Sequence, residues 1–480
     1  MSTLFETLTA EPIGISGKLE VLAPFNGQRL AQVETSNAEG VDHALAIAHG
    51  LYQNRESWLS AETRIAILER STSILTERAE AFAFAAAEEG GKPLKDSRIE
   101  VARAIDGLKS CVEVLRTQQG QEVPMGLNRA SAHRLAVTHH EPIGVVVAIS
   151  AFNHPVNLIV HQVGPAIAAG CPVIIKPAED TPLSCFRLVR ILREAGLPPQ
   201  WCQALVTDNH DSAERLATDP RVGFFSFIGS ANVGWMLRSK LAPGTRCALE
   251  HGGAAPVIVT EDADLETTLP ALAKGGFYHA GQVCVSVQRV FAHRSIALQL
   301  AERLVELAKD MKVGDPILPD TDVGPMIRAR ELERVHDWVR EAAEQGANIL
   351  CGGKPASETC YAPTVLFDPP QDVTLSRREI FGPVLCVYPY DDLDEAIALA
   401  NALPFAFQAA VFSRDIDTVM YCYQRLEASA VMVNDHTAFR VDWMPFAGLK
   451  QSGLGVGGIP YTFRDMQIEK MLVIQSKGLL

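Results

Sequence analysis

The stretch G-F-Y-H-A-G-Q-V-C-V-S-V-Q-R, residues 276–289, contains one side chain with nucleophilic chemistry, Cys284. The cysteine follows a short Gly-containing turn. Its thiol could therefore stand at the end of a loop, where backbone N–H groups could receive a negative charge. A free cysteine is also among the most buried residue types and often serves only as a small hydrophobe. This window alone favours the interpretation of Cys284 as a buried hydrophobe. Residues elsewhere in the chain must therefore decide between a structural and a nucleophilic cysteine.

Two further side chains could assist a nucleophile. Asn153, in A-F-N-H-P, follows an apolar run and offers an amide that could donate to an oxyanion. An Asx-turn before Pro155 is the alternative. Glu250, in E-H-G-G, stands where a strand should end, and partial desolvation there could make it a general base. The alternative is that Glu250 is an ordinary loop carboxylate that precedes a turn.

Charged residues follow another expected strand, in K-P-A-E at 176–179. The carboxyl ends of parallel strands are where such sheets bind ligands. Lys176 could hold ribose hydroxyls or a phosphate, and Glu179 could accept hydrogen bonds from the hydroxyls of an adenosine ribose. Solvated loop charges are the alternative.

A strand-to-helix turn is expected in F-I-G-S-A-N-V-G at 227–234. Gly229 permits a tight turn, and Ser230 would stand at a helix N-terminus that could receive a pyrophosphate. The segment lacks the spacing G-x-G-x-x-G, so a plain connection is the alternative.

Five buried runs alternate with helical patterns between residues 144 and 250, which predicts a parallel, doubly wound α/β sheet. A second α/β segment follows Gly253. The expected strands lie at 144–150, 171–175, 203–206, 222–228 and up to Glu250, then at 256–259, 364–368, 384–389, 430–433 and near the C-terminus. The expected helices include 38–54, 61–89, 97–117, 264–278, 295–311, 329–346 and 392–402. A half-exposed strand is expected at 131–140.

Composition narrows the class of protein. A chain of 480 residues with 47% hydrophobic and 21% charged residues predicts a globular protein of two or three domains. The net charge of −14 disfavours nucleic acid and anionic membrane surfaces as partners. Ten cysteines are scattered without C-x-x-C pairs or zinc spacing, which predicts no metal site and a reducing compartment. The first residues carry acids and lack a signal-peptide pattern, so a cytoplasmic location is expected.

Together the motifs resemble the NAD(P)-dependent aldehyde dehydrogenase superfamily along nearly the whole chain. In order, they are N-H-P at 153–155, K-P-A-E at 176–179, F-I-G-S at 227–230, E-H-G-G at 250–253, G-Q-V-C at 281–284, E-I-F-G-P at 379–383, V-N at 433–434 and P-F-A-G at 445–448. The resemblance implies a thiolate at Cys284 that attacks an aldehyde. Asn153 and the Cys284 N–H would hold the oxyanion, and Glu250 would activate the water that hydrolyses the thioester.

The resemblance also implies a dinucleotide cofactor. Its contacts would be Lys176 and Glu179 at the adenosine ribose, Gly229 and Ser230 at the pyrophosphate, and Glu379 and Phe381 at the nicotinamide ribose and ring. An acidic Glu179 should repel a 2′-phosphate, so NAD is expected and NADP remains possible. Some positions depart from the family pattern, namely Phe152, Ile228, His251, Ala254 and the segment after Lys450, which lacks an acidic residue of a proton relay.

The substrate is expected to be a small polar or anionic aldehyde. Residues 435–446 resemble branches that act on lactaldehyde and phosphonoacetaldehyde. His154, Arg103 and Arg440 are candidate lining residues, since an arginine can clamp a carboxylate or phosphonate. The alternatives are an exposed helix face for Arg103 and structural pairing of Arg440, for example with Asp442.

The implied fold is a Rossmann-like NAD-binding domain, a second α/β catalytic domain and a small β oligomerisation element. The expected boundaries are 1–119 with 142–252, then 253–446, and 120–141 with 463–480. A homodimer or homotetramer is expected. Two other functions stay open: a CoA-acylating enzyme, disfavoured by Glu250, and a catalytically silent binding or structural protein, disfavoured by retention of the three catalytic groups.

Overall fold

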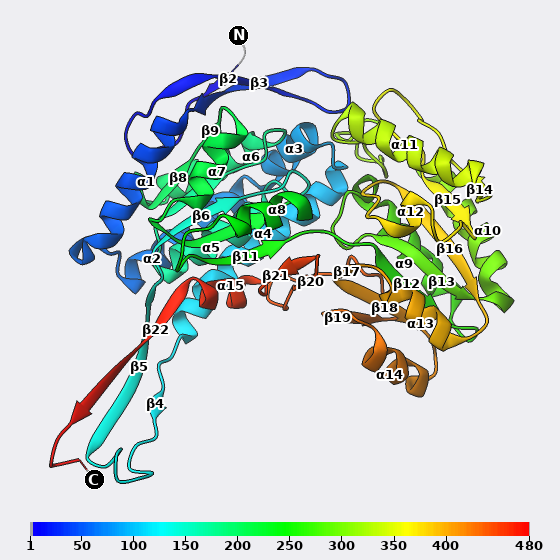
Figure 1. Ribbon diagram of the computed structural model, residues 1–480. Coiled ribbons are helices and arrows are strands. Elements are labelled where there is room, and N and C mark those ends of the chain that lie inside the picture. Colours follow the sequence, from blue (N-terminus) through cyan, green and yellow to red (C-terminus); the bar gives the residue numbers. More distant parts are fainter. Residues whose placement is uncertain (1–2, 480) are drawn as a thin grey trace.

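The computed structural model describes residues 3–479. Figure 1 shows two α/β lobes side by side and a narrow β arm that projects from the N-terminal lobe. Each lobe is built around its own sheet, and the polypeptide passes from the first to the second after residue 250.

A six-stranded sheet forms the centre of the first lobe. In spatial order its strands are β21 (Gly453–Leu454), β11 (Arg246–Glu250), β10 (Val222–Ile228), β6 (Val145–Ile149), β7 (Val173–Lys176) and β8 (Cys202–Ala204). All neighbours are parallel except β11 and β21. All five residues of β6, V-V-V-A-I, are buried, as suits a strand covered on both faces. The expected doubly wound sheet is confirmed.

Helices cover both faces of this sheet. They are α1 (Ala38–Gln53), α2 (Ala61–Glu77), α3 (Ala79–Gly90), α4 (Leu94–Thr117), α5 (Asn157–Ala169), α6 (Pro182–Glu194), α7 (His210–Thr218) and α8 (Ala231–Ser239). Val146 and Ala148 pack in the core formed with α2 to α6. Val145 and Val147 point to the opposite face and pack with α1, α7 and α8. This alternation is the two-residue period of a strand.

The helical pattern at 61–89 forms two helices, not the single helix expected. Arg78, between α2 and α3, has φ −104° and ψ 12°, which is not helical. Its guanidinium donates hydrogen bonds of 2.8 and 2.7 Å to Glu194 at the end of α6. Both helices bury apolar residues in the same core, so the apolar pattern continues through the break and conceals it.

A seven-stranded sheet forms the second lobe. In spatial order its strands are β14 (Asn348–Cys351), β15 (Thr364–Phe367), β16 (Val384–Tyr390), β13 (Val287–His293), β12 (Ala255–Val259), β18 (Gln408–Phe412) and β19 (Ala430–Val433). Only β14 is antiparallel to its neighbour. The helices are α9 (Leu265–Phe277), α10 (Arg294–Asp310), α11 (Ala329–Glu344), α12 (Thr374–Arg377), α13 (Leu393–Asn401) and α14 (Ile416–Arg425).

The sequence did not reveal two central strands of this sheet, β13 and β18. β13 reads V-Q-R-V-F-A-H, and its polar residues obscure the buried pattern. Gln288 is buried because its amide donates to the carbonyls of Leu375 and Arg378, at 3.0 and 2.7 Å. Arg289 is buried because its guanidinium donates to three backbone carbonyls. Polar groups satisfied in this way can lie inside a core.

Three smaller sheets complete the described part of the chain, and one of them pairs β17 (Phe405–Ala406) with β20 (Leu449–Lys450). The N-terminal strands are β1 (Thr3–Phe5), β2 (Ile15–Leu22) and β3 (Arg29–Ser36), with β9 (Val206–Thr207) beside β3. The arm contains β4 (Glu122–Val123), β5 (Arg134–Pro142) and β22 (Gln467–Gln475), which follows α15 (Ile459–Asp465). The domain boundaries, and the role of the arm in oligomerisation, stay predictions. Within residues 3–479, no helix combines the length and apolarity needed to span a membrane.

Candidate active site

The structure places Cys284, Glu250 and Asn153 around one cavity of about 1160 Å³. Cys284 comes from the loop before β13, Glu250 ends β11, and Asn153 follows β6. The cavity therefore lies where the carboxyl ends of the first sheet face the second lobe, the usual position for a ligand in an open α/β sheet.

The loop that carries Cys284 has an unusual backbone. His279 and Ala280 have φ values of 50° and 53°, in the left-handed region that costs a non-glycine residue about 1–2 kcal/mol. Gln282 holds the loop: its side chain donates to the carbonyl of Pro325 at 3.2 Å and accepts from the N–H of Ile327 at 2.9 Å. Such strain persists where the surroundings fix it, so the position of Cys284 is determined by its neighbours.

The Cys284 thiol is partly buried and belongs to the cavity wall. Burial raises its pKa, and the nearby Glu250 raises it further, whereas Arg440 opposes the rise. A raised pKa favours the protonated thiol over the thiolate in this arrangement. Attack on an electrophile requires a base that removes its proton.

Asn153 is bonded to the cysteine loop. Its Nδ2 donates to the carbonyl of Gln282 at 2.9 Å, and the residue is buried. The Asn153 side chain therefore bonds to the cysteine loop and does not form the Asx-turn considered above. An amide nitrogen carries two hydrogens, so one remains for a second acceptor in the cavity.

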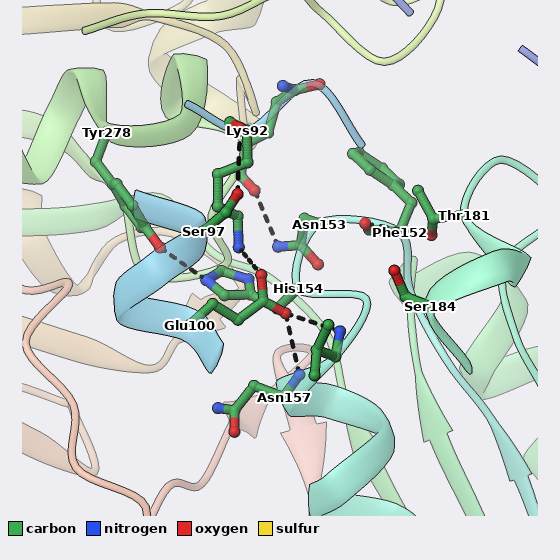
Figure 2. A network of polar contacts seen from close by, with 12 residues as sticks. Lys92, Ser97, Glu100, Phe152, Asn153, His154, Asn157, Thr181, Ser184 and Tyr278 are labelled. Carbon is green, nitrogen blue, oxygen red and sulfur yellow. Dashed lines mark hydrogen bonds and ion pairs between the residues drawn. The ribbon is translucent and has the colours of Figure 1, made fainter. Parts of the chain in front are cut away.

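A buried ion pair supports the Asn153 loop (Figure 2). Lys92 Nζ lies 2.6 Å from Glu100 Oε2, and both side chains are almost completely shielded from water. The other oxygen of Glu100 accepts the N–H groups of Val156 and Asn157, at 2.8 and 3.0 Å. These N–H groups begin α5, where a carboxylate is favourable because the first helical donors lack partners within the helix. The pair thereby fixes the chain just after Asn153.

Glu250 combines a buried carboxylate with a fixed backbone. Its carbonyl accepts the N–H of Gly229 at 3.0 Å, and its side chain is 14% exposed. Burial raises the pKa of this carboxyl, while Arg440 and Arg103 act in the opposite direction. A carboxylate with a raised pKa is a stronger base than a solvated one, so the position suits proton abstraction.

Arg440 is largely buried beside Glu250. Its Nη1 lies 3.7 Å from Glu250 Oε1, and its guanidinium carbon lies 3.6 Å from the ring centroid of Phe446. Its Nη2 is 3.4 Å from Nδ1 of His161. Its Nε is buried and has no hydrogen-bond partner within residues 3–479. The guanidinium therefore retains donor capacity at the cavity wall.

Asp442 pairs with Arg103 and His161. The structural pairing considered for Arg440 is present, but its partner is Glu250 and not Asp442. Asp442 Oδ1 accepts from Arg103 at 2.7 Å and from His161 Nε2 at 2.6 Å. Arg103 is only 22% exposed, so the exposed helix face considered for it is wrong. Although burial opposes it, hydrogen bonds from His161 and Arg103 hold the pKa of Asp442 far below its usual range.

His154, the third candidate lining residue, contributes a neutral ring. It is almost fully buried at the cavity wall, and its Nε2 lies 3.1 Å from the hydroxyl of Tyr278. Burial lowers its pKa well below the ordinary value. His154 and Tyr278 together form a polar but uncharged part of the wall.

The turn from β10 into α8 has the form required for a pyrophosphate. Gly229, Ser230 and the first residues of α8 line the cavity, and Ser230 is the N-cap without a side-chain cap bond. The N–H groups that begin a helix are free to bind an anion. At Gly229, a Cβ would lie 2.9 Å from the Phe227 ring, so a side chain would not fit without displacement.

Glu379 and Phe381 line the same cavity from the second lobe. Glu379 Oε1 accepts the N–H of Gly253 at 3.1 Å, and a Cβ on Gly252 would collide with this carboxylate. Burial raises the pKa of Glu379 to about 8. Phe381 has φ 49°, and its ring stands edge-on to Phe152 with centroids 5.9 Å apart. The lone pairs that Glu379 retains could accept hydrogen bonds from ribose hydroxyls. The rings of Phe152 and Phe381 could pack against a planar ring.

Lys176 and Glu179 lie at the end of β7 but outside the cavity lining, and their charged atoms are 3.4 Å apart. The lining here comes from Ala178 and Asp180, with Arg328 opposite. Arg328 Nε donates to Asp180 Oδ1 at 2.7 Å, and a second bond joins Nη2 to Oδ2. The residues present fit a dinucleotide along the first sheet.

Sequence reasoning missed several residues of the site: Tyr278, His161, Asp442, Phe446, Asp180 and Arg328. Asp442 was considered only as a partner of Arg440, although its segment was recognised. Tyr278 lies in the stretch around Cys284. A tyrosine would be expected in any buried loop, so its residue type gave no signal of a functional role. No group of acidic, histidine or cysteine side chains in the described part of the chain could hold a metal ion.

Comparisons with known proteins agree with this geometry. Residues 14–472 match the aldehyde dehydrogenase family. The 3-sulfolactaldehyde dehydrogenase of Priestia aryabhattai is 38% identical over 457 residues, 95% of each chain. Aldehyde dehydrogenase 21 from Physcomitrella patens, solved with its reaction product succinate, is 33% identical with a TM-score of 0.95 over 100% of both chains. A glyceraldehyde-3-phosphate dehydrogenase from Methanocaldococcus jannaschii, solved with NADP, is 32% identical with a TM-score of 0.91 over 96% of this chain and 100% of that one.

Proposed function

Since this chain belongs to the aldehyde dehydrogenase family, we propose that it oxidises a small anionic aldehyde to the carboxylic acid, with NAD as the oxidant. The observation that carries the substrate class is Arg440. Its guanidinium is largely buried at the cavity wall that Cys284 and Glu250 share, and its Nε lacks a partner within residues 3–479. A buried guanidinium that keeps one unused donor after it has paired with Glu250 favours an anionic ligand.

The first chemical step joins the thiol to the aldehyde. Glu250 removes the proton of Cys284, whose sulfur then bonds to the carbonyl carbon. The carbonyl oxygen becomes the oxyanion of a thiohemiacetal. The free Nδ2 hydrogen of Asn153 and the N–H of Cys284 stabilise that charge. The left-handed turn at His279 and Ala280 holds the loop from which Cys284 lines the cavity.

The second step is oxidation, and the third is hydrolysis. A nicotinamide held by Glu379 and Phe381 would supply the hydride acceptor, and loss of hydride from the thiohemiacetal carbon would leave a thioester on Cys284. Glu250, once it has released the proton of the first step to solvent, takes a proton from a water molecule that attacks the thioester, and it returns that proton to the departing sulfur. The carboxylic acid leaves, and Cys284 regains its thiol. The raised pKa of Glu250 suits it to take up a proton in both the first and the third step.

The substrate's anionic group would be held by Arg440, with Arg103 nearby. Asp442 fixes Arg103 with two hydrogen bonds and so leaves Arg440 as the cation with spare donors. Relatives named above support this class, since sulfolactaldehyde, succinate and glyceraldehyde-3-phosphate all carry an acidic group. His154 and Tyr278 add uncharged hydrogen-bonding groups for a small polar chain.

The coenzyme would lie across the first sheet. Its pyrophosphate would contact Gly229 and Ser230, and Glu379 with Phe381 would hold the nicotinamide end. Lys176 and Glu179 would lie by the adenosine ribose. A homodimer or homotetramer is supported by the arm, where four successive apolar residues of β22, 471–474, are each at least 43% exposed.

The test is a substrate panel followed by NADH absorbance. Matched pairs of short aldehydes, with and without a terminal carboxylate, sulfonate or phosphate, are compared for the native protein and for Arg440→Gln. We expect kcat/KM for anionic aldehydes to fall at least about tenfold in the variant, with neutral aldehydes affected much less. Equal losses for both classes would reject the role of Arg440. Addition of CoA tests the CoA-acylating alternative, because an acyl-CoA product would exclude hydrolysis by Glu250.

A further inference from the structure

His251, which follows the candidate base Glu250, is a buried residue of the cavity wall that takes no part in the proposed reaction. It is only 2% exposed. Its imidazole packs against the rings of Phe227 and Trp235, with centroids 5.7 and 6.0 Å away. A Cβ on Gly234 would collide with the imidazole, so this ring lies directly against α8.

The imidazole is bonded to the turn that precedes α8. Its Nδ1 lies 2.8 Å from the carbonyl oxygen of Gly229. A carbonyl oxygen only accepts, so Nδ1 carries the proton and donates it. Burial lowers the pKa of His251, although this bond acts in the opposite direction, so the neutral ring is favoured. The other nitrogen, Nε2, is buried and has no hydrogen-bond partner within residues 3–479.

Two consecutive residues hold Gly229 from both sides of its peptide units. Its N–H donates to the carbonyl of Glu250 at 3.0 Å, and its own carbonyl accepts from His251. The peptide between Gly229 and Ser230 is planar and trans, since the described chain contains no cis peptide bond. The C=O and N–H of a trans peptide point in opposite directions. The Ser230 N–H is therefore directed away from the imidazole.

The bond from His251 thus fixes the direction of a donor at the start of α8. Gly229 and Ser230 line the cavity where the pyrophosphate is proposed to bind. A donor that is already oriented binds an anion more tightly, because less conformational entropy is lost on binding. A hydrogen bond to the carbonyl of a peptide also polarises its N–H. Without the bond from His251, this peptide could rotate and its N–H would lose its fixed direction.

We propose that His251 is a positioning residue for the coenzyme: by donating to the Gly229 carbonyl, it orients the Ser230 N–H toward the pyrophosphate. His251 acts through the peptide of the turn and does not contact the coenzyme in this role. The inference rests on the proposed function, because it requires a dinucleotide whose pyrophosphate lies at the start of α8.

The test measures equilibrium binding of NAD by calorimetry, without aldehyde, in two variants. His251→Leu removes the donor and keeps a side chain of similar size. His251→Asn keeps a donor, because the Asn Nδ2 is attached at the same position as the histidine Nδ1, but leaves a gap where the ring packed. We expect His251→Leu to raise the Kd for NAD about fivefold or more, and His251→Asn to change it less than about twofold.

ADP-ribose separates the turn from the nicotinamide end, because it carries the pyrophosphate and lacks the nicotinamide. In His251→Leu, the Kd for ADP-ribose should rise by the same factor as the Kd for NAD. His336→Leu is the matched control, since this partly buried histidine contacts the Tyr361 hydroxyl and does not line the cavity. It should leave both dissociation constants unchanged. Thermal unfolding of each variant checks that the fold is intact.

Equal affinities of the native protein and His251→Leu for NAD would overturn the inference. A loss in His251→Asn as large as that in His251→Leu would also overturn it, because the side chain would then act only through packing. A loss confined to NAD would place the effect at the nicotinamide end and reject the role at the turn. In these three cases the native protein still binds NAD, so the proposed function stands. If the native protein binds neither NAD nor ADP-ribose, the proposed function fails as well.

Discussion

Arg440 Nη1 lies 3.7 Å from Glu250 Oε1, so a candidate substrate-binding cation and the candidate base are electrostatic neighbours. Arg440 holds the pKa of Glu250 below the value that burial alone would produce. An anionic substrate that engages Arg440 would weaken this effect. Glu250 would then become more basic when substrate binds, which links recognition of the anion to proton abstraction.

The first prediction concerns this neighbouring charge. Arg440→Gln removes a cation that lowers the pKa of Glu250, so that pKa should rise. A base acts only when deprotonated, hence activity should be lost at a higher pH as the solution is acidified. We expect the acid limb of kcat/KM for a neutral aldehyde to move up by about one pH unit. A limb that stays in place or moves down would contradict the coupling.

The second prediction concerns the nucleophile. Cys284→Ala should lower aldehyde oxidation by at least about a thousandfold, because no other group forms the covalent intermediate. NAD should still bind, since its expected contacts at Gly229 and Glu379 are untouched. Cys351→Ala is the matched control, because that partly buried thiol belongs to β14 and does not line the cavity. Substantial turnover by Cys284→Ala would exclude the assignment.

The third prediction separates oxidation from hydrolysis. Glu250→Gln keeps the side-chain shape but cannot take a proton from water. Because Glu250 is also proposed to deprotonate Cys284, we expect the first turnover to slow at neutral pH and the steady rate to fall at least about a hundredfold. Raising the pH, which favours the thiolate directly, should speed the first equivalent of NADH per site but should not restore the steady rate. Rapid-mixing absorbance measures both phases, and mass spectrometry should find the acylated protein. A steady rate equal to that of the native protein would remove Glu250 from the mechanism.

The fourth prediction concerns the buried pair in Figure 2. Glu100→Gln leaves the Lys92 charge buried without its counter-ion and weakens the bonds that begin α5. We expect a loss of about 3 kcal/mol in the free energy of unfolding. Glu80→Gln breaks a pair with Arg98 in which both side chains are well exposed, and should cost less than about 1 kcal/mol. Denaturant unfolding of both variants tests the difference, and equal losses would refute it.

Much of the fold was predictable from the sequence, because a buried strand can be recognised from its own residues. Runs such as Val145–Ile149 are short, apolar and β-branched, and the helices between them follow a regular period. β13 escaped this reasoning because Gln288 and Arg289 are satisfied by carbonyls that are close only in three dimensions. The motifs around Cys284, Glu250 and Asn153 were recognisable because they occur along the chain in the order typical of a known family.

The charge pairing of the site was not predictable in the same way. Arg103 and Asp442 are separated by 339 positions, and no periodicity connects them. A helical pattern places Arg103 on a surface, but it cannot indicate that a loop from the distant end of the chain covers that surface. Arg328 and Asp180, 148 positions apart, were missed for the same reason.

The hydrogen bond from Asn153 to the Gln282 carbonyl has a consequence for mutagenesis. One nitrogen both fastens the nucleophile's loop and offers a donor to the reacting oxygen. Replacement by alanine releases a strained turn as well as removing a stabilising dipole. The penalty at this position should therefore exceed that of losing an oxyanion donor alone, and a lower melting temperature should accompany it.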